Sequence, residues 1–462
     1  MSSPPFPPSS HDRLLGCLIG GALGDAIGLF TEFLPKAESA QLYGSTPSLS
    51  LLPPGSHPLA TPNMKAMHMD RHRGMFSPGS WTDDTDQSLL ILLSWLRSGG
   101  TTLDPKDFAQ RLKVWCREGL RALARPPLGL GRTVGASVHA PGWLEDPIGI
   151  AREKWESTGR VVAPNGAVMR TAIIGCLCYQ DKDGVSGLDR AFFASMQLGA
   201  TTHADPRCLV SCAIVSGIIV AIMRGELASE QDVRGIVTAA LAFLEARPEF
   251  PDKLSENHRA ELEQLYVWPS SLDQLALDER KSIGYTYKCL GSAMWALRKA
   301  LEWRANGQVP DRDMFERIIT DITMEGGDAD TNAVVAGAIV GCYLGVQGLC
   351  YRWAVGLGEG ERAGGETVGL REWLTQKGEA ACVLLGISEM PAATYDPTTD
   401  HDTLLYGAED AVALTDKEMD DMMWGKVMAG MAQRMGHADD PKYNQPVPRH
   451  SAKSKNGDCT IM

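Results

Sequence analysis

The sequence predicts an all-α protein built as a single large helical bundle, and two observations carry this prediction. Apolar residues recur at intervals of three and four in many segments, which is the period of a helix with one buried face. Pairs of segments with the alternating pattern of β-strands are missing from the sequence. The helical pattern is clearest in residues 87–97, 108–124, 170–178, 209–223, 233–245 and 291–303.

Glycine and proline gather between these segments and mark the loops that connect them. The clusters lie at residues 52–57, 126–131, 141–149 and 164–166. The chain has 462 residues, of which 44% are hydrophobic, so it can bury a large core. Its composition does not change before about Met390, and we therefore expect one domain over residues 11–390.

Two of the expected helices, residues 14–30 and 332–350, are apolar and carry glycine at every fourth position. These glycines are Gly16, Gly20, Gly24 and Gly28 in the first segment and Gly337, Gly341 and Gly345 in the second. Glycine costs roughly 1 kcal/mol relative to alanine inside a helix, so its repeated use indicates close approach of two helix backbones. Independent glycines in two core helices are the alternative. Both segments approach the length of a membrane span, but Asp25 and the lack of a basic flank argue against one.

Charge and cysteine content limit the partners and the location of the protein. The formal net charge of −13 argues against general binding of nucleic acid or anionic lipid and suits a metal or a neutral to cationic ligand. Eleven cysteines without regular spacing read as reduced thiols, which predicts a cytosolic or nuclear protein. Residues 1–10 are rich in proline and serine and lack the features of a signal peptide, so we expect a disordered N-terminus.

Two acidic motifs stand directly before expected helices, at residues 79–86 (GSWTDDTD) and 326–331 (GGDADT). A single aspartate at such a place is normally a helix cap. Neighbouring carboxylates repel one another unless a cation or proton lies between them, so capping does not account for the whole set. Carboxylate and hydroxyl oxygens suit Mg²⁺, Mn²⁺ or Ca²⁺, whereas the absence of His and Cys from both motifs argues against zinc.

These motifs are two of six that stand in the order found in the ADP-ribosylglycohydrolase family, and the chain resembles this family over about residues 13–345. The others are residues 16–28 (GCLIGGALGDAIG) with 31–33 (TEF), 165–170 (NGAVMR), 202–206 (THADP) and 284–285 (GY). The resemblance implies an orthogonal helical bundle with a cleft for two Mg²⁺ ions, or Mn²⁺. It also implies removal of ADP-ribose from a protein side chain or a small molecule. In similar enzymes the metals position the distal ribose and a water beside its anomeric carbon.

The resemblance assigns roles to residues one by one. The metal ligands are Thr82, Asp83, Asp84, Asp328, Asp330 and Thr331, and the catalytic residues are Glu32, Asp83 and Asp84. Glu32 is expected on a mobile loop above the metals, as an acid/base or a gate. The implied substrate-binding residues are Asn165, Gly166, His203, Tyr285, Gly326 and Gly327.

Several of these residues also have a purely structural interpretation. Asn165 is either a helix cap or, with Gly166, part of a site for the diphosphate. A lone histidine such as His203 is more often packed or capping than bound to a ligand. Tyr285 stacks on adenine or belongs to the core. Asp25 would be costly to bury without a partner, so we expect it to bond to a backbone group or a ligand.

One departure from the family concerns residues 127–134 (PLGLGRTV), where many relatives carry an aspartate. No carboxylate stands there, so the linkage that is cleaved stays open. There are two alternative functions. One is a non-catalytic relative that binds ADP-ribose or has a structural role, and the other is a hydrolase of another phosphate or nucleoside substrate. We expect a monomer.

The C-terminal part differs from the rest of the chain. Residues 391–438 predict a helical extension with a methionine-rich stretch at 416–435, and the polar residues 439–462 predict a disordered tail. The chain ends in Cys459-Thr460-Ile461-Met462, which matches a prenylation box that favours farnesyl. Weak, reversible membrane association through Cys459 is therefore a hypothesis.

Overall fold

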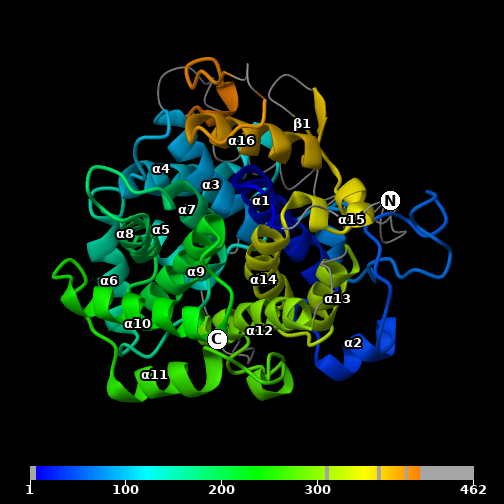
Figure 1. Cartoon of the computed structure of the whole chain (residues 1–462), viewed down its shortest axis with the longest axis horizontal. Helices are drawn as coiled ribbons and strands as arrows, with labels where there is room; N and C mark the ends of the chain where they lie inside the picture. Colours follow the sequence, from blue (N-terminus) through cyan, green and yellow to red (C-terminus); the bar gives the residue numbers. More distant parts are fainter. Residues whose placement is uncertain (1–6, 307–311, 362–365, 391–393, 406–462) are drawn as a thin grey trace.

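The computed structural model describes residues 7–306, 312–361, 366–390 and 394–405, and nearly all regular structure in them is helical (Figure 1). The α-helices are α1 (Ser10–Gly28), α2 (Lys36–Tyr43), α3 (Asp83–Arg97), α4 (Pro105–Glu118), α5 (Arg132–Val138), α6 (Pro147–Ser157), α7 (Ala172–Cys178), α8 (Gly187–Ala200), α9 (Pro206–Arg224), α10 (Glu230–Ala246), α11 (Glu256–Glu261), α12 (Thr286–Ala305), α13 (Arg312–Thr323), α14 (Ala329–Leu344), α15 (Tyr351–Gly356) and α16 (Leu370–Leu384). The all-α prediction is confirmed.

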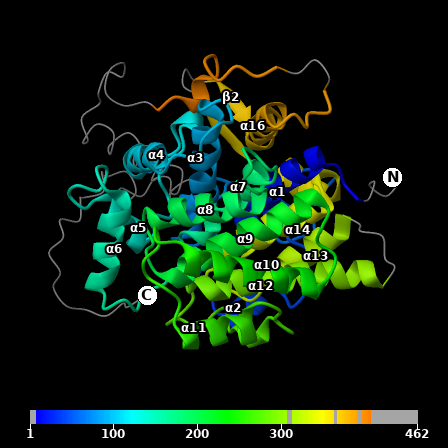
Figure 2. The same ribbon diagram turned by 60° about the vertical axis from the view of Figure 1, so that its left-hand side comes forward.

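Short elements complete the described structure. The single-turn helices are η1 (Arg73–Met75), η2 (Arg121–Leu123), η3 (Val168–Arg170), η4 (Leu262–Tyr266), η5 (Asp273–Leu275), η6 (Val346–Gly348) and η7 (His401–Thr403). A small antiparallel hairpin, β1 (Glu359–Glu361) with β2 (Thr367–Gly369), was not expected from the sequence. In both ribbon views α16 and this hairpin lie at one end of the molecule and α11 at the other (Figure 1, Figure 2).

Two predicted helices end earlier than the sequence suggested, and a glycine explains each end. The predicted helix 108–124 is wrong beyond Glu118, because Gly119 has a φ of 75° and a Cβ there would lie 1.8 Å from the Arg125 carbonyl oxygen. Likewise α14 ends at Leu344, where Gly345 has a φ of 71°. Glycine adopts this backbone conformation without the steric cost that other residues meet.

The helices α1 and α14 form the centre of the protein and run antiparallel in direct backbone contact (Figure 1, Figure 2). A Cβ on Gly16 would lie 2.2 Å from the Gly341 carbonyl oxygen, and one on Gly20 would lie 2.5 Å from that of Gly337. At the other end, a Cβ on Gly28 would lie 2.4 Å from the Cα of Asp330. The predicted packing of the glycine faces is confirmed, and it brings the second acidic motif to the end of α1.

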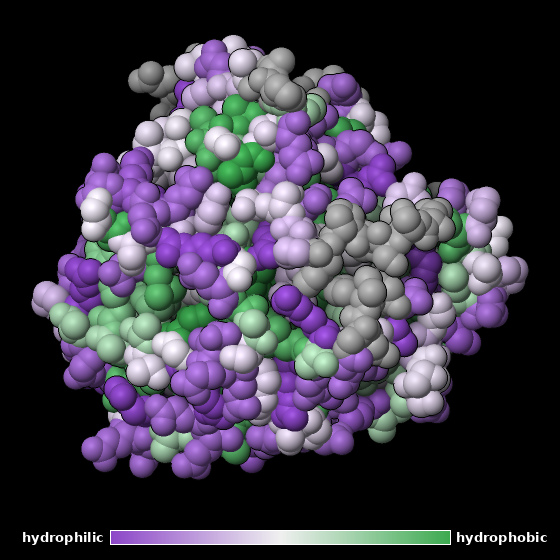
Figure 3. Space-filling model, in the orientation of Figure 1, coloured by the Kyte–Doolittle hydropathy of each residue, from purple (hydrophilic) through white to green (hydrophobic). Residues whose placement is uncertain are grey.

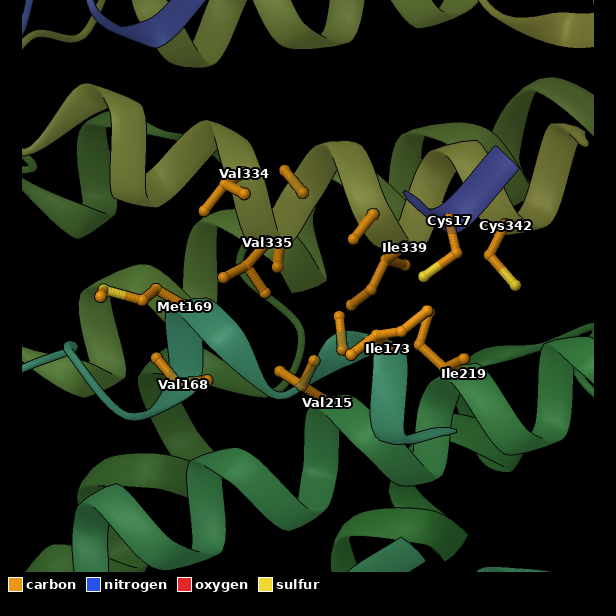
Figure 4. Close-up of a cluster of buried hydrophobic side chains, with 14 of the residues drawn as sticks. Cys17, Val168, Met169, Ile173, Val215, Ile219, Val334, Val335, Ile339 and Cys342 are labelled. Carbon is orange, nitrogen blue, oxygen red and sulfur yellow. The ribbon is translucent and has the colours of Figure 1, made fainter. Parts of the chain in front are cut away.

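The remaining helices surround this pair and bury its apolar side chains. Side chains of α14 face those of α7 and α9 across a tightly filled space, with Val335 and Ile339 above Ile173 and Val215 (Figure 4). Among the described helices, α9 alone is long and apolar enough to cross a membrane, and all of its apolar window is buried inside the protein. The sequence pointed instead to α1 and α14, which are buried along almost their whole length.

The surface and the C-terminal region bear on the other predictions. The face in Figure 3 is mainly hydrophilic, with scattered apolar areas. The ten cysteines of the described part are all free. Residues 394–405 fold back onto the bundle, since Lys377 bonds to Asp400 (2.6 Å) and Arg111 to the Thr403 carbonyl (3.0 Å). Residues 1–6, the predicted helix at 416–435, the tail at 439–462 and Cys459 lie outside the described residues.

Candidate metal centre

The first acidic motif is held in place by Asp25, which projects from α1. One oxygen of Asp25 accepts a hydrogen bond from the Thr82 amide (2.8 Å), and the other accepts from the Thr85 amide (3.0 Å) and hydroxyl (2.6 Å). Asp25 is fully buried, and this burial raises its pKa to about 6. The expectation that it bonds to backbone groups is confirmed. Asp25 therefore fixes the turn in which Thr82 caps α3 and Asp83 and Asp84 begin it.

The three aspartates of this motif have different surroundings. Asp86 is turned into the core, where it accepts hydrogen bonds from the indoles of Trp81 (2.7 Å) and Trp115 (3.0 Å). Asp83 accepts one from Gln87 (2.8 Å), and Asp84 interacts with Thr331 of the second motif. Asp84 is thus directed to the second motif, Asp83 has Glu32 and Asp328 among its charged neighbours, and Asp86 has a structural role.

The second motif depends on two glycines for its shape. Gly326 and Gly327 have φ values of 70° and 69°, and a Cβ on either would lie 2.1 Å from a backbone oxygen, of Leu34 and Leu277 respectively. The turn they form presents Asp328 at the N-terminus of α14. Both glycines therefore pack against neighbouring loops, and their predicted contact with substrate stays a prediction.

Glu32 joins the second motif through the backbone of its own turn. The Phe33 amide donates to the Gly327 carbonyl (2.6 Å), and the Gly327 amide donates to the Leu34 carbonyl (2.9 Å). Among the described residues, Glu32, Asp328 and Asp330 form a group whose ligand oxygens lie within 4.8 Å of one another. The His72 ring stands 2.6 Å from the Glu32 carboxylate, a contact that no motif in the sequence indicated.

The electrostatics of this cluster fit a bound cation. Burial, followed by repulsion from neighbouring carboxylates, raises the pKa of Asp83, Asp84 and Asp330 well above the usual range of aspartate. Burial likewise raises the pKa of Asp328 to about 6. Within the described part of the chain, one buried oxygen each of Asp84 and Asp330 has no hydrogen-bond partner. Hard, unpaired, mutually repelling oxygens are suitable ligands for a divalent metal ion.

The other predicted binding residues line the same region. Asn165 does not cap the short helix η3, which has Ala167 at its N-cap and no side-chain capping bond. The side-chain amide of Asn165 donates to Asp328 instead (2.9 Å). A Cβ on Gly166 would lie 3.0 Å from the His203 ring, so these two residues are in contact. Burial, followed by the nearby Arg170, lowers the pKa of His203 well below its ordinary value, so the ring is neutral.

Tyr285 is a half-buried member of an aromatic cluster. Its hydroxyl donates to Glu261 (3.1 Å), and its ring lies 5.3 Å from that of Tyr287 and 6.3 Å from that of Tyr266, between ring centroids. The Arg207 guanidinium lies 5.6 Å from the centre of the same ring. The structural interpretation of Tyr285 accounts for these contacts, and stacking on adenine stays a prediction.

The glycine loop at residues 127–134 lies directly against the first motif. Gly129 has a φ of 94°, and a Cβ on it would lie 2.3 Å from a carboxylate oxygen of Asp83. Any larger residue at this position would displace Asp83. The loop therefore restricts the space at the centre without adding a ligand of its own.

A model of the family described as ADP-ribosylglycohydrolase matches residues 7–415. The chain belongs to this family. All six motifs lie inside the matched residues, so the resemblance read from the sequence is confirmed. The prediction of an ADP-ribosyl glycohydrolase is confirmed at the level of the family, and the acids of its two central motifs are the ones that meet in the structure.

Similar proteins bear names from the same chemistry. ADP-ribosylarginine hydrolase Tri1 of Serratia proteamaculans is 25% identical over 355 residues, which cover 76% of this chain and 77% of the relative. The ADP-ribosyl-dinitrogen reductase glycohydrolase of Rhodospirillum rubrum is 25% identical over 358 residues, with 75% and 90% covered. A solved structure named ADP-ribosylglycohydrolase-related protein complex aligns with 82% of this chain and 99% of its own, at 23% identity and a TM-score of 0.48.

Proposed function

We propose that this chain is a metal-dependent hydrolase that releases ADP-ribose from modified protein side chains or small ADP-ribosylated molecules. The observation that carries the proposal is a cluster of buried or half-buried carboxylates from three separate segments. Glu32, Asp328 and Asp330 offer oxygens within 4.8 Å of one another, and Asp83 and Asp84 interact electrostatically with acids of this group. Glu32 follows α1, Asp83 and Asp84 begin α3, and Asp328 and Asp330 begin α14. Such a cluster is costly to bury unless a cation or a positively charged reaction centre compensates it.

Six residues are proposed to hold two Mg²⁺ ions, or Mn²⁺, at this centre: Thr82, Asp83, Asp84, Asp328, Asp330 and Thr331. When bound, these ions would lower the pKa of a water molecule and orient the hydroxyls of the distal ribose. The buried, unpartnered oxygens of Asp84 and Asp330 support this assignment. Asn165 fixes the orientation of the Asp328 carboxylate with its amide.

The protein side chains suit cleavage at the anomeric carbon. Breaking the glycosidic bond builds positive charge on the ribose ring, and a neighbouring carboxylate stabilises such charge. Glu32 is the proposed acid/base or gate, because its carboxylate belongs to the acidic group and its turn pairs with Gly327 of the second motif. His203 and Gly166 are proposed to contact the rest of the ADP-ribose, with a neutral ring that donates or accepts a hydrogen bond.

An arginine-linked substrate is the first one to test. Relatives over three quarters of the chain are named for ADP-ribosylarginine hydrolysis. A guanidinium leaving group is cationic, which suits a chain with a net charge of −13 and an acidic centre. The loop around Gly129 contributes no carboxylate, so it would select the linkage by shape rather than by charge.

The test compares three substrates in the presence of Mg²⁺: an arginine-linked ADP-ribosyl protein, a serine-linked one and O-acetyl-ADP-ribose. We expect free ADP-ribose, separated by chromatography, from at least the first, and we expect release to stop with a chelator and return with Mg²⁺ or Mn²⁺. Calorimetry measures metal binding in parallel. Bound metal without turnover of any substrate contradicts the hydrolase, and ADP-ribose binding without turnover would identify the non-catalytic alternative. Turnover after exhaustive metal removal contradicts metal dependence.

We further propose a monomeric protein of the cytosol or nucleus that does not depend on nucleic acid. The ten free cysteines of the described part support a reducing compartment. Light scattering tests the monomer, and cell fractionation tests the compartment. Mass spectrometry of the native protein tests lipidation, and an unmodified Cys459 on an untrimmed C-terminus rejects the weak membrane association.

A further inference from the structure

The His72 ring occupies a prepared position beside Glu32. Its Nε2 lies 2.6 Å from Oε2 of Glu32, and its centroid lies 5.0 Å from that of Phe33 and 5.6 Å from that of Phe76. The Glu32 side chain is 7% exposed and that of His72 is 25% exposed. Two aromatic rings thus limit the orientation of the histidine, and its one identified hydrogen bond in the described part of the chain goes to the carboxylate.

The segment that carries His72 is joined to the Glu32 turn by a second, independent contact. The buried Arg73 guanidinium donates to the carbonyl oxygens of Phe30 (2.8 Å) and Glu32 (2.5 Å), and it forms an ion pair with Asp70. The Arg73 amide also donates to Asp70 (2.8 Å). The backbone of the Glu32 turn is therefore fixed to this segment without any contribution from the His72 ring, which leaves the ring free to act on the carboxylate.

Whenever the centre is without metal, the Glu32 carboxylate needs such a partner because its other neighbours repel it. Asp328 and Asp330 offer oxygens within 4.8 Å of it. A glutamate side chain has three rotatable bonds and would turn towards solvent under this repulsion. The Nε2–H of the ring can donate to the Glu32 carboxylate whether the imidazole is neutral or charged, so this restraint does not depend on the charge of the ring.

We propose that His72 is a positioning residue that holds the Glu32 carboxylate against Asp328 and Asp330 and thereby keeps Glu32 ready to act on the substrate. This inference rests on the proposed function, because Glu32 is assigned its role there. It assigns a role to a residue 40 positions from Glu32 in the sequence, outside all six family motifs. It also separates two duties, since Arg73 fixes the backbone of the turn and His72 fixes the side chain.

The test uses His72→Leu, which removes the donor, and His72→Gln, whose amide nitrogen reaches nearly the place of Nε2. We expect His72→Leu to lower kcat about tenfold or more while KM and Tm stay near those of the wild type. His72→Gln should restore most of the rate. His68→Leu is the matched control, because His68 is an exposed histidine of the same segment, and it should behave as wild type.

A combination with Glu32→Gln separates positioning from general structural support. If His72 acts only through Glu32, adding His72→Leu to Glu32→Gln causes no further loss of kcat. Further loss in the double variant, or equal damage from His72→Gln and His72→Leu, overturns the proposal.

A crystal structure of the His72→Leu protein provides a readout that does not need activity. We expect the Glu32 carboxylate to leave its place beside Asp328 and Asp330, whereas an unmoved carboxylate refutes the positioning role. If the wild type is inactive on every ADP-ribosyl substrate, the proposed function fails, and this structure still decides whether His72 positions Glu32. Should the leucine variant not fold, the structure of His72→Gln decides instead: a carboxylate held by the glutamine amide supports the role and a displaced one refutes it.

Discussion

Replacing Gly28 by alanine tests whether backbone contact between α1 and α14 positions the metal centre. The new Cβ would lie 2.4 Å from the Asp330 Cα and 2.5 Å from the Ala329 carbonyl oxygen. Ordinary contact begins at 3.4 Å, so the two backbones must separate by about 1 Å at this point. Overpacking of this kind costs about 1–3 kcal/mol, and here the displaced atoms belong to a proposed metal ligand.

We therefore expect Gly28→Ala to lose both stability and metal affinity, measured by denaturant unfolding and by calorimetry with Mg²⁺, and to lose turnover with them. Gly21→Ala is the control on the same helix, because its Cβ would lie 3.6 Å from the nearest atoms of α14. This control should fold as well as the wild type or gain up to about 1 kcal/mol from the better helix propensity of alanine. Equal stability and equal metal affinity in the two variants would refute the reasoning.

Three further predictions concern the acids of the centre. Asp328→Asn should abolish turnover and weaken Mg²⁺ binding in calorimetry. It should also raise the Tm of the metal-free protein, because one repelling charge is gone. Unchanged activity would show that Asp328 is not a ligand. Asp25→Asn should lower the free energy of unfolding by about 1–3 kcal/mol. The new NH₂ group would face the amide of Thr82 or Thr85 and leave that buried donor unpaired. A denaturant midpoint equal to that of the wild type would count against this role of Asp25. Burial raises the pKa of Asp328 to about 6 in the folded, metal-free protein, whereas its value in an unfolded chain is about 3.9. The folded protein therefore holds this proton more tightly than the unfolded chain does. The stability that results is complete at low pH and is lost as the pH rises through about 6. Metal-free protein should accordingly have a lower Tm at about pH 8 than at about pH 5, and saturating Mg²⁺ should remove this difference. A higher Tm at about pH 8 in the metal-free protein would contradict the raised pKa of Asp328.

Much of the fold could be predicted because it follows from local patterns. The spacing of apolar residues located α3, α4, α7, α9, α10 and α12 but missed α8, α13 and α16. The glycine faces predicted that α1 and α14 would meet. Helix ends were harder, because Gly119 inside an apolar stretch reads like a tolerated interior glycine. Its φ of 75° and its approach to Arg125 are set by the tertiary structure.

The site could be predicted only as far as its residues stand in motifs. Asp83, Asp84 and Asp86 look alike in the sequence, and the indoles of Trp81 and Trp115 decide which of them turns inward. His72 and Asn165 could not be assigned as partners of Glu32 and Asp328 without coordinates, since each pairing crosses a long stretch of chain. Side-chain partners of this kind depend on how loops from distant segments meet, which periodicity does not encode.

The contact between α1 and α14 also has a consequence for the making of the protein. The helix α1 spans residues 10–28 and is synthesised first, whereas α14, which it must contact, begins at Ala329, about 300 residues later. Throughout that interval the apolar surface of α1 lacks its final partner. The candidate metal centre can form only when synthesis has passed α14. A product that stops before the second motif holds three of the five acids, Glu32, Asp83 and Asp84, and lacks the helix against which α1 packs, so incomplete synthesis yields no partial enzyme.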